Sequence, residues 1–168
     1  MRALTLWQPW ASLLAAGAKR FETRSRVTHY RGPLLIHAAA RKFSPTAPRD
    51  AEILRHLNRP AFVEAMTEVL GHADLERLPY GAIIASARLE DCQQLPEGLH
   101  YIPSSFDRQL EREALFGDFT PGRYLWRVEI VRKLDVPVRA PGARMLWSPA
   151  LDLIARVSAE IERMEARP

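Results

Sequence analysis

The chain has 168 residues, of which 47% are hydrophobic and 26% are charged, and its net charge is +4. This length suffices for one domain with a single core, and the composition excludes a disordered or membrane-spanning chain. Cys92 is the only cysteine, which excludes an internal disulfide and a cysteine-rich zinc site. The N-terminal sequence MRALTLWQPW lacks the pattern of a secretory signal, and no apolar run approaches the ~18 residues of a membrane span. We therefore expect a cytoplasmic protein that does not associate with membranes.

The positive charge is concentrated in the first part of the chain. Residues 1–50 contain nine Lys or Arg side chains and two Asp or Glu side chains, whereas the remaining residues contain 15 basic and 18 acidic side chains. This asymmetry predicts a polyanionic partner such as a nucleic acid. The alternative is a solvated surface whose imbalance of charge has no function.

The first seventy residues are predicted to contain three strands and three helices. Pro9 is suited to the first position of a helix because it has no N–H to leave unpaired, and Gly17 is suited to the left-handed end of that helix. Alternation and apolar runs define the strands, and prolines open the two later helices. The predicted strands are 2–6, 20–24 and 34–40, and the predicted helices are 9–17, 48–57 and 60–70.

The rest of the chain is predicted to be mostly strand until a final helix. The predicted strands are 82–92, 124–134 and 145–147, with a short helix within 105–117 and a last helix that begins at Ser148-Pro149. Strands and helices do not alternate regularly enough for a doubly wound parallel sheet. We therefore predict an α+β fold, a small mixed or antiparallel β-barrel with peripheral helices.

The last helix has an apolar stripe at helical spacing. We expect this stripe to pack on the domain, because an amphipathic helix normally buries its apolar face within its own fold. A dimer contact is the alternative. The stripe consists of Leu151, Ile154, Val157, Ile161 and Met164.

A short charged pattern follows the first predicted helix. Lys19 comes just after the helix end, and Glu22 and Arg24 are two residues apart on a strand, so their side chains point to the same face. A guanidinium can donate hydrogen bonds to the polar edge of a ring, and a carboxylate beside it can accept them. Lys19 adds a positive charge that can pair with a phosphate. The alternative is a surface ion pair worth ~0–1 kcal/mol.

Several motifs together resemble the start of the ASCH domain (activating signal cointegrator homology domain), which has a PUA-like fold. They are Gln8-Pro9-Trp10, the pattern Gly-x-Lys-x-x-Glu-x-Arg at residues 17–24, Arg31-Gly32-Pro33 before the strand with His37, and the later segments 81–92, 117–129 and 142–147. The resemblance predicts an ASCH-like domain at 1–147, with the helix at 148–168 packed on it.

The resemblance implies a small β-barrel with a basic cleft and a role in RNA binding. One similar branch hydrolyses the acyl amide of N4-acetylcytidine with a lysine, a threonine three positions later and a glutamate, and another has ribonuclease activity. This chain keeps the lysine as Lys19 but has Glu22 at the threonine position, while Thr23 points to the other strand face. The departure removes the specific support for an amidohydrolase. If the protein is an enzyme, Lys19 and Glu22 are the predicted acid–base pair.

RNA or nucleotide binding is the favoured prediction, with a hydrolase and a protein-interaction domain as alternatives. Trp7 is a better candidate for base stacking than Trp10, which heads an apolar helix stripe. His37 is predicted to be a hydrogen-bonded core residue, and no residues are placed to hold a metal or a cofactor with it. The predicted nucleic-acid-binding residues are Trp7, Gln8, Lys19, Glu22, Arg24, Arg26, Tyr30, Arg31, Arg41 and Lys42.

Overall fold

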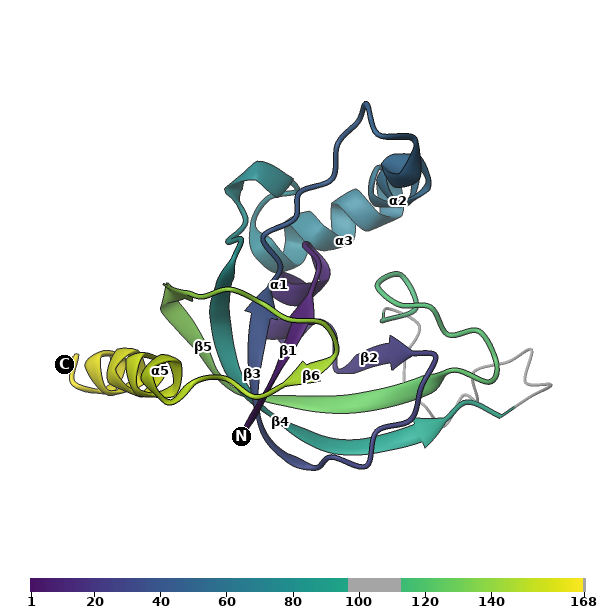
Figure 1. The fold of residues 1–168 in the computed structure, drawn as a ribbon. Helices are drawn as coiled ribbons and strands as arrows, with labels where there is room; N and C mark the ends of the chain where they lie inside the picture. Colours follow the sequence, from purple (N-terminus) through teal and green to yellow (C-terminus); the bar gives the residue numbers. More distant parts are fainter. Residues whose placement is uncertain (97–112, 168) are drawn as a thin grey trace.

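The structure is a computed structural model that describes residues 1–96 and 113–167 (Figure 1). The helices of these residues lie around a six-stranded sheet. The strands are β1 (Arg2–Leu6), β2 (Phe21–Arg24), β3 (Gly32–Ala38), β4 (Ala82–Gln94), β5 (Tyr124–Arg139) and β6 (Leu146–Trp147). The helices are α1 (Trp10–Ala15), α2 (Ala51–Leu57), α3 (Pro60–Leu70) and α5 (Leu151–Glu165), with short 3-10 turns at Pro48–Asp50 and Leu75–Arg77.

The sheet is mixed and has the strand order β2-β5-β4-β3-β1-β6. The pairing of β1 with β3 is parallel, and the other pairings are antiparallel. The sheet curls into a half-barrel, with α2 and α3 beyond one end and α5 at its side (Figure 1). The predicted α+β class, a small mixed barrel with peripheral helices, is confirmed in this half-barrel form.

Both faces of the sheet are covered by apolar side chains. Successive residues of a strand point to opposite faces, so Leu34 and Ile36 of β3 join the core beneath α1, whereas Leu35 joins the core beneath α5. This two-sided burial explains the continuous apolar run of β3. The core on one face also holds α1, and the end of α1 leads directly into the Gly-x-Lys-x-x-Glu-x-Arg pattern at residues 17–24.

A third apolar cluster connects α1 to α2 and α3. Leu13 of α1 packs with Phe62 and Met66 of α3 and with Phe116, and the rings of Phe62 and Phe116 meet edge to face at 5.5 Å. The helical pair therefore rests on α1, and α2 is held opposite the start of β2.

The last helix packs on the sheet with three of the five residues of the predicted stripe. Leu153 and Val157 are buried against the sheet, with Ile161 and Met164 partly buried beside them. Leu151, which the stripe included, is 85% exposed in the first turn of the helix. A role of α5 in dimer formation stays a prediction.

Strand β5 extends further than predicted because it tolerates Pro137. Lys133 pairs with Ala85 and Val138 pairs with Ile83, so the residues between them bulge out of the ladder. A proline without an N–H is compatible with such a bulge. The short helix predicted within 105–117 falls mostly outside the described residues. Within the described part of the chain, no helix has the length and apolar character needed to cross a membrane.

Candidate nucleic-acid interface

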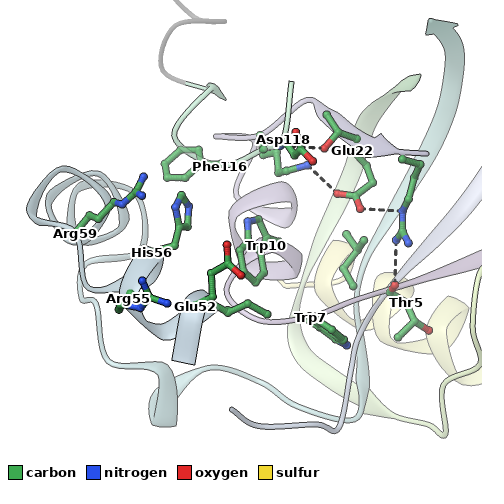
Figure 2. A pocket seen from close by; sticks show the side chains of 16 residues that line it. Thr5, Trp7, Trp10, Glu22, Glu52, Arg55, His56, Arg59, Phe116 and Asp118 are labelled. Atoms are coloured by element: carbon green, nitrogen blue, oxygen red, sulfur yellow. Dashed lines mark hydrogen bonds and ion pairs between the residues drawn. The ribbon is translucent and has the colours of Figure 1, made fainter. Parts of the chain in front are cut away.

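A pocket of about 670 Å³ opens where the end of β1, the strand β2 and the helix α2 meet (Figure 2). Four segments contribute to its wall. They supply Thr5, Leu6, Trp7 and Trp10; Lys19, Glu22, Thr23 and Arg24; Glu52, Ile53, Arg55, His56 and Arg59; and Phe116, Gly117 and Asp118. The pocket therefore contains the face of the Gly-x-Lys-x-x-Glu-x-Arg pattern that the sequence singled out.

Gly17 turns the chain from α1 toward the pocket. Its φ of +76° lies in the left-handed region, and the N–H groups of Ala18 and Lys19 both donate to the carbonyl oxygen of Leu13, at 3.1 and 3.3 Å. A side chain with a Cβ is strained in this conformation, whereas glycine adopts it freely. The turn places Lys19 beneath the strand that follows.

Glu22 connects the two cations of the pattern. Its Oε2 accepts a hydrogen bond of 2.8 Å from Nζ of Lys19, and its Oε1 lies 3.0 Å from Nε of Arg24. The second contact is an ion pair and not an aligned hydrogen bond, because Nε of Arg24 is left without a hydrogen-bond partner. The predicted contact between Glu22 and Arg24 is confirmed.

Lys19 is not the surface charge that the sequence suggested. Its side chain is only 2% exposed, and Nζ also donates to the carbonyl oxygen of Phe21. The reason is that the turn at Gly17 directs the side chain under β2, where Glu22 neutralises it. In this structure Lys19 organises the pocket floor and is not free to contact a phosphate.

Arg24 reaches from β2 across to the end of β1. Its Nη2 lies 3.5 Å from the carbonyl oxygen of Thr5, and its guanidinium carbon lies 5.9 Å from the ring centre of Trp126. The side chain remains partly exposed to the pocket. Glu22 and Arg24 thus present an acceptor and a donor next to each other.

Trp7 forms an aromatic surface at the mouth of the pocket. Its ring is 42% exposed, the guanidinium carbon of Arg41 lies 4.6 Å from the ring centre, and the ring of Phe43 meets it edge to face at 5.5 Å. Arg41 is held in turn by the buried carboxylate of Asp50, which also accepts from the N–H of Ser44 at 3.0 Å. Arg41, predicted to bind nucleic acid directly, instead supports Trp7 and does not line the pocket.

The charge of the pocket is nearly balanced. Asp118, on the far side of Glu22, is ionised at neutral pH: burial alone would raise its pKa, but hydrogen bonds from Thr120 and the charge of Arg123 lower it overall. The lining contains four basic and three acidic side chains, which are Lys19, Arg24, Arg55 and Arg59 against Glu22, Glu52 and Asp118. The pocket is therefore much less cationic than the first fifty residues suggested.

The family model of the ASCH domain matches residues 4–140. The chain belongs to the ASCH domain family. Activating signal cointegrator 1 of Homo sapiens is 37% identical over 89 residues, a match that covers 53% of this chain and 14% of that protein. The mouse protein, also named activating signal cointegrator 1, is 33% identical over 110 residues, which cover 61% of this chain and 17% of the relative. The matches thus span less than a fifth of each relative.

Among solved structures, a mutant ASCH protein from Zymomonas mobilis is similar to this chain over 94% of its length and 96% of the other chain. The TM-score is 0.49 and the sequence identity is 13%. The predicted family is thus confirmed by the family model, and the predicted domain at 1–147 contains all the matched residues.

Gln8 of this ASCH domain lies away from the pocket surface. Its side chain is 1% exposed, its Nε2 donates to the carbonyl oxygen of Pro79 at 2.6 Å, and its Oε1 accepts from the N–H of Ser12 at 3.1 Å. The second bond satisfies an N–H in the first turn of α1, which would otherwise lack a partner. Gln8, predicted to bind nucleic acid, therefore has a structural role.

Four other predicted binding residues are not in the pocket lining. Tyr30 donates to the carbonyl oxygen of Pro33, and Arg31 is paired with Asp91 at 3.2 Å. Lys42 is paired with Glu76. Arg26 follows β2, where its carbonyl oxygen accepts from Nε1 of Trp126 at 3.1 Å. The structure does not bring these side chains together with Glu22 and Arg24.

Most of the basic side chains of residues 1–50 are neutralised within the molecule. Within the described residues, six of the nine form an ion pair with a carboxylate, often one from a later segment. These pairs are Lys19 and Arg24 with Glu22, Arg20 with Glu113, Arg31 with Asp91, Arg41 with Asp50 and Lys42 with Glu76. The charge asymmetry of the sequence thus exaggerates the positive charge of this part of the structure.

Sequence reasoning missed the wall of the pocket that α2 provides. Arg55, His56 and Arg59 line it, and they come from a segment for which the sequence predicted only helices, with no role in binding. His56 comes one residue after Arg55 and Arg59 comes four residues after it, so the three side chains lie close together at the end of the helix. This spacing indicates a binding wall only once α2 is known to face β2.

Glu113 was also missed, and it fixes the start of β2. Its side chain is fully buried, and its Oε2 accepts from the N–H groups of Arg20 and Phe21 at 2.9 and 3.0 Å. Glu113 therefore holds the strand that presents Glu22 and Arg24.

The remaining predictions concern His37 and metals. His37 is the buried, hydrogen-bonded core residue that the sequence predicted, with Nε2 3.0 Å from the carbonyl oxygen of Ala140. In the described part of the chain, no group of three or more His, Cys, Asp or Glu residues is arranged to hold a metal ion.

Proposed function

We propose that this ASCH domain binds RNA by taking an unpaired base into the pocket. The observation that carries the proposal is the adjacent carboxylate and guanidinium of Glu22 and Arg24, which lie 3.0 Å apart and both line the pocket. The edges of nucleobases alternate hydrogen-bond donors with acceptors. An acceptor beside a donor on a rigid strand is complementary to such an edge.

The aromatic side chain at the mouth supports the same ligand. Trp7 exposes part of its ring while Arg41 and Phe43 hold it in place. Stacking of a base on an aromatic ring contributes ~1–3 kcal/mol and accepts any base. The ring and the Glu22–Arg24 pair provide the two elements of base recognition, a stacking surface and a hydrogen-bonding edge.

The proposal specifies single-stranded RNA. A base can present its edge to a pocket only when it is unstacked and unpaired, as in loops, bulges and ends of RNA. Membership of the ASCH family supports a nucleic-acid ligand in general. The shape of the pocket favours one base at a time over a double helix, which proteins contact mainly along its phosphates and grooves.

Fluorescence anisotropy with labelled single-stranded RNA, double-stranded RNA and single-stranded DNA tests the proposal. Arg24→Gln removes the guanidinium group and its charge from the pocket, and Arg144→Gln removes the same charge from an exposed position outside it. We expect Arg24→Gln to weaken binding of single-stranded RNA about tenfold, and Arg144→Gln to leave it within twofold. Equal affinities of the two variants, or tighter binding of double-stranded RNA, would contradict the proposal.

Hydrolysis of RNA or of a modified nucleoside is the second candidate function. It is favoured by the hydrogen bond between Lys19 and Glu22, two residues that both contribute to the pocket lining. Thr23 is not a free hydroxyl, because its Oγ1 accepts from the N–H of Asp118 at 3.2 Å. Analysis of the same binding samples for cleaved or deacylated products tests this function, and turnover that survives Lys19→Ala would exclude the pair from the mechanism.

A further inference from the structure

The cations of the pocket divide into two groups that differ in their partners. Lys19 and Arg24 both form ion pairs with the single carboxylate of Glu22. The side chains of Arg55 and Arg59 are exposed and make no hydrogen bond or ion pair within the residues that the structure describes. Only the second group has no carboxylate partner among the described residues, so its guanidinium groups are free to pair with a ligand.

The two groups lie on opposite walls. Figure 2 shows Arg55, His56 and Arg59 on the side of α2, and Glu22 and Thr5 on the side of the sheet. Trp10 lies between the walls in this view. A ligand that fills the space therefore meets a hydrogen-bonding edge at one end and free guanidinium groups at the other.

One carboxylate at the α2 wall would repel an anionic ligand. Glu52 lies one turn before Arg55 and also lines the pocket. Two guanidinium groups outnumber it, and guanidinium is suited to phosphate because its donors form a planar fork that matches two phosphate oxygens. The local balance of charge therefore still favours one phosphate group.

The volume of the pocket limits the size of the ligand. At about 670 Å³ it falls in the range of ~300–1,000 Å³ that is typical of sites for small molecules and cofactors. A single nucleotide is a ligand of this class, whereas a run of several nucleotides needs a longer groove.

From these observations we infer that the pocket holds one nucleotide, with its base at Glu22 and Arg24 and its phosphate at Arg55 and Arg59. The inference rests on the proposed function and adds the phosphate subsite and the size of the ligand. A phosphate on an unpaired nucleotide occurs both in free mononucleotides and at each position of an RNA strand. The experiment below therefore includes both.

Isothermal titration calorimetry with the four ribonucleosides, their 5′-monophosphates and a single-stranded RNA pentamer tests the inference. The proteins are the wild type, the double variant Arg55→Ala/Arg59→Ala and the matched control Arg77→Ala/Arg144→Ala. The control removes the same charge from exposed positions outside the pocket lining. Circular dichroism and thermal unfolding establish that each variant is folded.

We expect the best-bound monophosphate to bind the wild type at least about tenfold more tightly than its nucleoside, because the charged phosphate adds charge-assisted hydrogen bonds. In Arg55→Ala/Arg59→Ala this ratio should fall to about one while the nucleoside affinity stays within twofold. The control variant should keep the wild-type ratio. If the ratio persists without the two arginines, or nucleoside affinity falls as much as nucleotide affinity, the phosphate subsite is wrong.

The pentamer separates failure of the inference from failure of the proposed function. If the pentamer binds but no mononucleotide does, the one-nucleotide pocket is wrong and RNA binding stands. If the monophosphates bind and the pentamer does not, the source of the ligand is a free nucleotide and the phosphate subsite stands. If neither binds, both the inference and the proposed function are wrong.

Discussion

Nζ of Lys19 lies 2.8 Å from Oε2 of Glu22, in a pair whose side chains are only 2% and 12% exposed. Removing charges from water costs free energy, and this pair recovers it through close contact and through the bond from Nζ to the carbonyl of Phe21. Because Glu22 is also paired with Arg24, the carboxylate holds both cations of the pattern.

The central position of Glu22 predicts unequal effects of removing either partner. Glu22→Ala leaves the buried ammonium of Lys19 without a counter-charge, so we expect the free energy of unfolding to fall by about 3–5 kcal/mol. Lys19→Met should cost less than half of that, because Glu22 keeps its ion pair with Arg24 and the methionine fills the space. Urea-induced unfolding measures both losses. Equal losses in the two variants would contradict the bridging role of Glu22.

Gly17 provides a prediction about the turn that positions Lys19. The φ of +76° favours glycine, and no atom lies within 4 Å of the place of a Cβ, so substitution is opposed by backbone strain alone. We expect Gly17→Ala to lower the free energy of unfolding by about 1–2 kcal/mol. Gly17→Asn should cost less, because asparagine tolerates the left-handed region better. If the alanine and asparagine variants are equally stable, strain at this position is not the cause.

His37 makes stability depend on pH. Burial lowers its pKa from 6.5, and the hydrogen bond with Ala140 opposes this effect only in part. Nδ1 has no hydrogen-bond partner, and Gly142 packs so tightly against the ring that a Cβ there would lie 2.6 Å from Nδ1. A second ring proton would thus be buried without an acceptor.

The sign of this pH effect follows from the proton balance. The unfolded chain takes up a proton on His37 as the pH falls below about 6.5, whereas the folded protein resists it. The free energy of unfolding should therefore be constant above about pH 7 and decrease toward pH 5.5, with a slope of at most about 1.4 kcal/mol per pH unit. His37→Gln, which keeps an N–H donor for Ala140, should lower stability at pH 7 but remove this slope. An unchanged slope in the variant would assign it to other groups.

The ion pairs of the first fifty residues predict a weak dependence of RNA binding on salt. If the only phosphate neutralised is the one held by Arg55 and Arg59, the slope of log K against log salt should be about −0.7, since each phosphate neutralised on a single strand contributes about −0.7. A slope of about −6 is expected if all nine N-terminal cations contact phosphates. Anisotropy titrations over a series of salt concentrations measure it, and a slope steeper than about −4 would show that the intramolecular pairs open on binding.

The sequence was informative where the relevant residues are close in the chain. Gly17, Lys19, Glu22 and Arg24 lie within one helix end and one short strand, so spacing alone predicted that the last two share a face. The strand 34–40 could also be predicted, because both faces of β3 are buried and its sequence is therefore continuously apolar.

The sequence was uninformative where long-range packing decides the role of a side chain. Gln8 is structural because Pro79 supplies an acceptor from a distant turn, and Arg31 is neutralised by Asp91 on β4. Counting charges along the chain cannot reveal such partners. The same limit hid Arg55 and Arg59, since their contribution depends on how α2 packs over α1 and faces β2.

Nitrogen-15 NMR of the labelled protein, titrated with a single-stranded RNA pentamer, tests the location of binding most directly. Trp7 and Trp10 line the pocket, whereas α5 lies on the opposite face of the sheet. Base binding at Glu22 and Arg24 predicts that the indole signals of Trp7 and Trp10 and the Nε signal of Arg24 shift, while the amide signals of α5 stay in place. Shifts confined to α5, or spread evenly over the surface with the Trp7 and Arg24 signals unchanged, would contradict the account.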